Sequence, residues 1–252
     1  MSRLFRGLVV FAGLLLLWQA LVSVAELPHY ILPGPAAVLG ALAARPGLIA
    51  GHAVHTLAEI LLGLAIGAAL GCATALVMSF FRPARRWLLP VVVVSQAIPV
   101  FALAPLLVLW LGYGMASKVA MAVLIIYFPV TAAFFDGLRR TEPGWLDLAR
   151  TMGASRWAIL RRIRLPAALP ALASGLRVAA AVAPIGAVIG EWVGSSAGLG
   201  YLMLHANARV QIDVMFAALV TLAAIGVALY FAVDAALRRL VPWQPETLFM
   251  ED

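Results

Sequence analysis

The chain has 252 residues, of which 64% are hydrophobic and 12% are charged, and its formal net charge is +7. Soluble domains average about 45–50% apolar and about 25% charged residues, so this composition excludes a single soluble globular core. It predicts several membrane spans of about 20 apolar residues each. Positive charge is also typical of nucleic-acid-binding proteins, but their basic, solvated domain face is absent, so no nucleic acid is expected as a partner.

The first apolar segment, residues 7–25, follows two arginines, which predicts a membrane helix with a cytoplasmic N-terminus. A cleaved signal peptide is the alternative, because Ser23-Val24-Ala25 could form a small-residue cleavage site. The apolar run is long for the central region of a signal peptide, about 7–15 residues, which favours the membrane helix. A short surface helix is expected next, over residues 35–44, with Pro35 in its first turn.

The second predicted span, residues 54–81, contains Gly63, Gly67 and Gly71 at a four-residue spacing. This spacing places the three glycines on one stripe of a helix. The stripe either lets a neighbouring helix approach closely or reflects the ordinary tolerance of membrane helices for glycine. The sequence leaves both interpretations open.

The third predicted span, residues 88–111, contains three prolines, which kink or interrupt a helix. Backbone groups freed in this way are tolerated at membrane depth only inside protein or beside a wet cavity. The segment is therefore expected in the interior, either as a kinked packing helix or as part of a solute pathway. The candidate pathway residues in it are Ser95, Gln96, Pro99, Phe101 and Trp110.

Three more spans are predicted over residues 119–135, 172–193 and 213–237, with a polar, glycine-containing loop at 194–212 between the last two. Six spans place both termini on one side of the membrane. With the termini inside, fourteen of the eighteen basic residues lie on the cytoplasmic side. This is the asymmetry that the positive-inside bias requires, so both termini are expected to be cytoplasmic.

Two ionisable residues lie in the fifth predicted span, Arg177 and Glu191, and charged residues inside a membrane are functional candidates. They are about 21 Å apart along a helix that rises 1.5 Å per residue, so they cannot pair directly. Arg177 is expected to reach toward the cytoplasmic interface. Glu191 is expected near the outer end, as a gate, pathway or packing residue. His52 and His55 share a helix face but lack a third ligand, so no metal site is expected.

The polar stretch 141–166 is predicted to form a helix, a glycine turn and a second helix at the cytoplasmic surface. Thr141 is expected to cap the first helix, with Pro143 in its first turn. Gly153 is expected to end that helix in the left-handed conformation, and Ser155 to cap the second. The first helix has one apolar face, made of Trp145, Leu148, Ala149 and Met152.

This stretch resembles the EAA signature of ABC-transporter permeases of the binding-protein-dependent importer class. The signature is Glu-Ala-Ala, three residues, Gly, nine residues and Ile-x-Leu-Pro; this chain has Asp147-Leu148-Ala149, Gly153 and Ile163-Arg164-Leu165-Pro166 at that spacing. Aspartate in place of glutamate keeps the charge, and leucine in place of alanine enlarges the apolar face. The resemblance implies that this helix and turn couple the chain to an ATPase through Trp145, Asp147, Leu148, Ala149, Met152, Gly153, Ala154 and Pro166.

The resemblance extends over nearly the whole chain and is closest to the nitrate, sulfonate, taurine and pyrimidine-precursor branch. Ile98-Pro99, Glu191 and Gly198-Leu199-Gly200 are among the residues that carry it. It implies an all-α, polytopic fold of the type I importer permeases: one transmembrane domain over residues 1–252, with six spans and a coupling helix. It also implies a bacterial inner membrane, two ATPase subunits, an extracytoplasmic solute-binding protein and a second, identical permease copy.

No cofactor is expected on this chain. A phosphate-binding loop needs Gly-Lys before Ser or Thr, and the single lysine, Lys118, follows Ser117. ATP and Mg²⁺ are therefore expected on the partner ATPase. The terminal part of the chain most resembles hydroxymethylpyrimidine permeases, so a thiamine pyrimidine precursor is the expected solute, with sulfonate, taurine or nitrate as the alternative. A membrane-embedded enzyme would need convergent catalytic side chains, whereas the polar residues of these spans are sparse and scattered.

Overall fold

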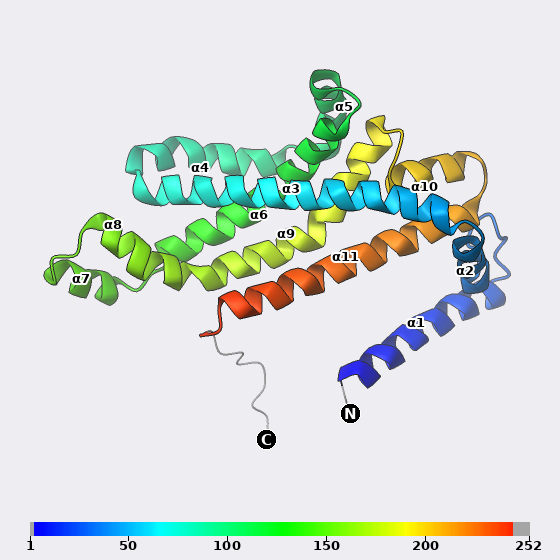
Figure 1. Ribbon diagram of the computed structural model, residues 1–252, viewed down its shortest axis with the longest axis horizontal. Helices are drawn as coiled ribbons and strands as arrows, with labels where there is room; N and C mark the ends of the chain where they lie inside the picture. Colours follow the sequence, from blue (N-terminus) through cyan, green and yellow to red (C-terminus); the bar gives the residue numbers. More distant parts are fainter. Residues whose placement is uncertain (1–2, 244–252) are drawn as a thin grey trace.

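The computed structural model describes residues 3–243, and every regular element within that range is a helix. Four helical segments are long and apolar enough to cross a membrane: α3 (Pro46–Phe80), α6 (Met115–Arg139), α9 (Leu165–Gly194) with the turns that precede it, and α11 (Ile212–Leu240). They run side by side along the long axis of the molecule (Figure 1). The expected all-α fold is confirmed.

The first and third predicted spans differ from these four. Helix α1 (Arg3–Val24) has a shorter apolar part and stands apart from the long helices except at its last turns (Figure 1). There, Trp18 donates a hydrogen bond from Nε1 to the Pro33 carbonyl at 3.1 Å, and its ring lies 6.1 Å from that of Phe216 in α11. Most of the apolar surface of α1 is therefore uncovered within the single chain.

The third predicted span is not one continuous helix. It consists of α4 (Arg82–Ala97) and α5 (Val100–Leu111), which meet at an angle of 102°. Pro99 cannot donate a backbone hydrogen bond and disfavours the helical conformation at Ile98, which is extended, with φ −84° and ψ 118°. Pro90 and Pro105 lie inside α4 and α5 without ending them. The prediction of a break was correct, and only Pro99 causes it.

Helix α6 lies between α3 and α9, and small residues allow both contacts. Gly63, Gly67 and Gly71 are buried and face α6, which confirms the close-approach interpretation of the glycine stripe. A Cβ atom added at Gly63 would lie 2.4 Å from the Cβ of Ala122. From the other side, a Cβ atom at Gly186 of α9 would lie 2.7 Å from the Cα of the same alanine. The three helices therefore pack almost backbone to backbone.

Two short helices lie at one end of the bundle. Helix α2 (Pro35–Ala44) has the predicted bounds and the predicted proline in its first turn. Helix α10 (Leu199–Ala208) was not predicted, because residues 194–212 were expected to be a loop. Its apolar residues Leu199, Leu202 and Ala206 are buried against α2 and α11. Their i, i+3, i+7 spacing was the available signal for a helix.

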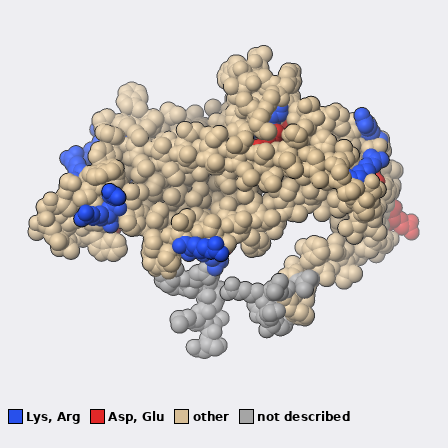
Figure 2. Space-filling model, viewed as in Figure 1, with Lys and Arg blue, Asp and Glu red and all other residues tan. Residues whose placement is uncertain are grey.

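The charged residues visible in Figure 2 gather toward the two ends of the long helices. One end carries α7 (Pro143–Thr151) and α8 (Arg156–Ile159), and the other carries α2 and α10 (Figure 1). Between them lies a broad, largely uncharged belt, interrupted by one small patch that contains both signs of charge (Figure 2). Such a belt suits the hydrocarbon core of a bilayer, about 30 Å thick.

Candidate functional site

The glycine turn after α7 has the geometry of a Schellman motif. The amide of Ala154 donates to the carbonyl of Ala149 at 2.9 Å, and the amide of Gly153 donates to the carbonyl of Arg150, also at 2.9 Å. Gly153 has φ +74°, the left-handed conformation that glycine adopts most easily. Ala154 packs against buried Ala149, the apolar contact that usually accompanies this motif. The predicted end of the helix is confirmed.

We expect Gly153→Ala to destabilise the loop by about 1–2 kcal/mol, because a Cβ atom is disfavoured at this backbone conformation. No atom lies within 4 Å of the added Cβ, so the cost comes from the backbone and not from a collision. Gly153→Asn should cost less, because asparagine tolerates left-handed geometry. Gly144→Ala, in α7 at an ordinary backbone angle, is the control. Protease susceptibility of the loop in the purified protein measures the difference, and equal cleavage of all three variants would contradict the expectation.

The ends of the loop differ in detail from the sequence prediction. Thr141 does not cap α7; its hydroxyl donates to the Leu138 carbonyl at 3.3 Å, and Glu142 occupies the N-cap position. Ser155 caps α8 as predicted, because its hydroxyl accepts from the Ala158 amide at 3.2 Å. Pro166 lies in the first turn of α9. The chain enters α9 from α8 through a π-helical turn at Leu160–Arg164, which lets it accommodate a proline that lacks an amide donor.

The predicted apolar face of α7 is divided between the interior and the surface. Ala149 is buried together with Leu146, and both pack against Ile159. Trp145, Leu148 and Met152 remain 53%, 63% and 78% exposed. Leu146 was not among the predicted residues, because the prediction took a single apolar face made of Trp145, Leu148, Ala149 and Met152. The packing of α8 against α7 buries one side of the helix and leaves the three large side chains outside.

The exposed side chains of α7 line a surface hollow of about 990 Å³. Its other walls come from the ends of α6 and α9, including Pro166, and from Trp243 near the end of the described chain. Asp147 points elsewhere and makes an exposed ion pair with Arg150 at 2.7 Å, a type of contact that contributes little to stability. The loop thus presents an apolar surface on a firmly folded support.

The candidate pathway residues of the third predicted span are not gathered around Glu191. Ser95 is half-buried and donates to the Val92 carbonyl, while Gln96 and Pro99 are exposed. Phe101 and Trp110 are 57% and 69% exposed on α5. Within the single chain these residues lie at the surface. Glu191 is only 1% exposed and belongs to a different environment.

Glu191 is the centre of a buried polar cluster that links α3, α9 and α10. Its Oε1 accepts a hydrogen bond from the Thr56 hydroxyl at 2.6 Å, and its Oε2 accepts one from the Gly200 amide. The side chain of Glu59 lies close to Glu191 and is 3% exposed. The Oε2 atom of Glu59 is buried without a partner in the described part of the chain.

Lys118 adds a positive charge to this cluster from α6. It is 1% exposed, and its ammonium group donates to the carbonyls of Tyr113, Gly114 and Gly194. In the sequence, Lys118 was considered only as the residue that follows Ser117, and Glu59 was overlooked. A signal for Glu59 was available, since it is an acidic residue inside an otherwise apolar span. The burial of Lys118 depends on tertiary packing that the sequence does not reveal.

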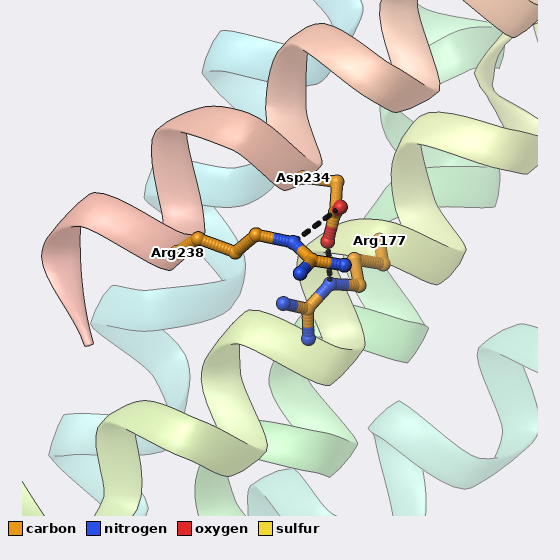
Figure 3. A network of polar contacts seen from close by, with 3 residues as sticks. All are labelled: Arg177, Asp234 and Arg238. Atoms are coloured by element: carbon orange, nitrogen blue, oxygen red, sulfur yellow. Dashed lines mark hydrogen bonds and ion pairs between the residues drawn. The ribbon is translucent and has the colours of Figure 1, made fainter. Parts of the chain in front are cut away.

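A second polar contact joins α9 to α11 (Figure 3). The Arg177 Nε atom donates to Oδ1 of Asp234 at 2.6 Å, and the Arg238 Nε atom donates to Oδ2 at 2.8 Å. The carboxylate is 14% exposed and lies between the two guanidinium groups. The expectation that Arg177 reaches toward the cytoplasmic interface stays a prediction. Its partner was not predicted, because Asp234 lies on the neighbouring helix.

A family profile and similar sequences both identify the same protein family. Residues 61–244, more than half of the chain, match the profile of the binding-protein-dependent transport system inner membrane component. A probable ABC transporter permease protein of Haemophilus influenzae is 57% identical over 239 residues, which is 95% of this chain and 98% of the relative. The formylaminopyrimidine transport permease protein ThiX of Halalkalibacterium halodurans is 36% identical, over 97% of this chain and 99% of its own.

One further similar sequence and one solved structure complete the comparison. The riboflavin transport system permease protein RibX of Chloroflexus aurantiacus is 38% identical, over 92% of this chain and 87% of its own. Among solved structures, an inward-facing form of the MetNI methionine ABC transporter has a chain with a TM-score of 0.66 and 21% identity. That match covers 77% of this chain and 95% of the other, so the two chains share a fold.

Proposed function

The chain belongs to the family of binding-protein-dependent transport system inner membrane components, and from this premise we propose how it couples to its ATPase. As a permease subunit of an ABC importer, it works with an ATPase that uses ATP and with a solute-binding protein. The coupling surface is the exposed apolar side of α7, supported by the Gly153 turn. Trp145, Leu148 and Met152 form this exposed surface, and buried Ala149 supports it. The other residues proposed for coupling lie beside it: Asp147, Gly153, Ala154 and Pro166.

The observation that carries this proposal is the exposure of Trp145, Leu148 and Met152 on an ordered helix. Large apolar side chains that cluster outside the lipid belt indicate a protein partner. The coupling helix is joined to the membrane part through the short turn at residues 152–155, whose conformation is fixed by hydrogen bonds to the end of α7. A single helical segment of 39 residues runs from Arg156 through the π-helical turn to Gly194. A movement imposed on the loop by the ATPase therefore reaches the far end of the bundle.

The test is Leu148→Asp in the permease co-expressed with its ATPase and binding protein. Leu148 is 63% exposed, so the variant should fold normally, but the new charge would be buried in the interface and left unpaired. We expect ATPase co-purification and solute uptake to fall at least tenfold. Arg150→Ala, in the same helix but directed away from that face, is the control. Unchanged uptake by Leu148→Asp, measured with labelled hydroxymethylpyrimidine, would disprove the proposed coupling surface.

The assembled importer contains a second, identical permease copy in this proposal. Two surfaces support it: the uncovered apolar side of α1, with Phe11 at 62% and Leu16 at 71% exposed, and the exposed aromatic residues of α5. The broken α4–α5 segment lies at the side of the bundle, where a second copy could complete a solute pathway. Its lining candidates are Ser95, Gln96, Pro99, Phe101 and Trp110. Both termini and α7 face the cytoplasm in this arrangement, as the positive-inside bias favours.

The proposed solute is a small heteroaromatic compound of the pyrimidine-precursor type. Two of the similar permeases are named for formylaminopyrimidine and for riboflavin, which share a nitrogen heterocycle. A neutral ring also suits aromatic candidates such as Phe101 and Trp110, whose flat faces can stack on it. A sulfonate, taurine or nitrate is the alternative. Uptake of labelled hydroxymethylpyrimidine that excess unlabelled taurine does not reduce would support the heteroaromatic solute, and the reverse result would support the alternative.

A further inference from the structure

The first turn of α10 is held by side chains from two other helices. The amide of Gly198 donates to His52 Nδ1 at 3.0 Å, and the amide of Leu199 donates to the Thr56 hydroxyl at 2.7 Å. The next amide, that of Gly200, donates to Glu191. The first amides of a helix have no partner within the helix itself. Here each of them is paired with a side chain of α3 or α9, so α10 is anchored at its N-terminus.

Glu191 fits this N-terminus so closely that two glycines are required. A Cβ atom at Gly198 would lie 2.1 Å from Oε1 of Glu191, and one at Gly200 would lie 2.7 Å from Oε2. Gly198 also has φ +107°, a conformation that other residues rarely adopt. The carboxylate faces the positive end of the helix dipole, where a negative charge is stabilised. The contact is therefore specific to a carboxylate at this place.

Lys118 fixes the other side of the same junction. Its ammonium group donates to the carbonyl of Gly194, the last residue of α9, and to two carbonyls in the turn before α6. The end of α9 is thus tied to α6 by Lys118 and to α10 by Glu191. The same helical segment begins at Arg156, beside the coupling loop, and α7 and α10 lie at opposite ends of the bundle (Figure 1).

We infer that Glu191 is a positioning residue that makes α10 move as one body with α9. This inference rests on the proposed coupling function and extends it to the opposite end of the bundle. A displacement that the ATPase imposes on the coupling loop is transmitted along α9 and, through the Glu191 carboxylate and the Thr56 hydroxyl, to α10. The exposed residues of α10, among them Leu204 and Asn207, then change position with the nucleotide state of the ATPase.

The experiment uses the assembled complex in a bilayer, with Cys72→Ala and Asn207→Cys in the permease. Cys72 is the single cysteine of the chain, so the new thiol is the only one in the permease that can react. The labelling rate with a membrane-impermeant maleimide is measured without nucleotide and after trapping with ATP and vanadate. We expect the two rates to differ at least threefold. Equal rates in a complex that hydrolyses ATP would overturn the inference.

Thr56→Val then tests the anchor itself. Valine has nearly the same shape as threonine but cannot accept from Leu199 or donate to Glu191, so the anchor is weakened with little change in volume. We expect the two labelling rates to become equal while the complex still hydrolyses ATP. Thr221→Val is the matched control, because the Thr221 hydroxyl donates only within its own helix, to the Ala217 carbonyl. A nucleotide-dependent rate that persists in Thr56→Val would show that the anchor is not the transmitting contact.

Glu191→Ala is the second variant, and it should also make the two labelling rates equal, because it removes the carboxylate that accepts from Thr56 and from the Gly200 amide. Failure of the wild-type complex to assemble or to hydrolyse ATP would contradict the proposed function as a whole. If the complex works but Glu191→Ala, added to the labelled permease, leaves the ratio of the two labelling rates unchanged, only this inference is contradicted. A purely structural role of Glu191 predicts a lower yield of complex, with an unchanged ratio of the two labelling rates in the complexes that do assemble.

Discussion

Gly63→Ala is expected to destabilise the permease by about 3 kcal/mol, the upper part of the range for overpacked sites. Alanine normally stabilises a helix relative to glycine by about 1 kcal/mol, so the expected sign is the reverse of the helix propensity. The reason is the contact with α6. The added Cβ would lie 2.4 Å from the Cβ of Ala122, a distance at which the helices must separate. Ala122 is fully buried and is also approached by Gly186 from α9, so it cannot move aside.

A second substitution should reverse this effect. The next nearest atom to the added Cβ is the Cα of Ala122 at 3.5 Å, which is an ordinary contact. Removing the Cβ of Ala122 therefore removes the collision, and Gly63→Ala with Ala122→Gly should regain most of the lost stability. Gly51→Ala is the matched control in the same helix, because no atom lies within 4 Å of its added Cβ. The fraction of monodisperse protein that remains after heating in detergent ranks the variants.

Two results would contradict this account of the α3–α6 contact. One is a Gly63→Ala variant as stable as Gly51→Ala, which would mean that the helices can separate at little cost. The other is a double variant no more stable than Gly63→Ala alone, which would place the strain somewhere other than Ala122. Either result would leave Gly63 without the proposed packing role against Ala122.

The helices and the coupling loop could be predicted from the sequence because local chemistry determines them. Continuous apolar runs indicate membrane spans, and Pro35, Gly153 and Ser155 occupy positions that a helix end requires whatever the tertiary structure. Their predicted roles were confirmed. The resemblance to importer permeases came from the spacing between Asp147 and Pro166, which composition alone does not produce. The family match over residues 61–244 confirmed it.

The polar cluster could not be predicted in the same way, because its side chains come from three helices, α3, α6 and α9. Thr56, Glu59, Lys118 and Glu191 are separated by up to 135 residues, and only packing brings them together. The helix α10 was missed for a related reason. Its N-terminal amides are satisfied by His52, Thr56 and Glu191, which replace the local capping residue that a sequence pattern would show. Long-range partners of this kind leave no periodic signal.

Lys118→Met is expected to have the largest effect on stability, about 3–5 kcal/mol, because it removes one partner from a buried charged group. Methionine has a similar length but leaves the carboxyl groups of Glu59 and Glu191 without the positive charge of the nearby lysine. It also leaves the carbonyls of Tyr113, Gly114 and Gly194 without this donor. Arg209→Met is the control at the same end of the bundle, since Arg209 is exposed and the change should stay within about 0.5 kcal/mol.

Combining Lys118→Met with Glu59→Gln separates the two contributions of the lysine. Glutamine removes one acidic group and can donate from its amide, and the Oε2 atom of Glu59 has no partner to lose among the described residues. If the ammonium group acts mainly by balancing charge, the double variant should recover at least half of the stability lost by Lys118→Met. If it acts mainly by holding the end of α9 to α6, Glu59→Gln should recover nothing, because the three carbonyls remain unpaired. Thermal unfolding of the two single variants and the double variant measures this coupling, and the size of the recovered stability decides between charge balance and mechanical attachment.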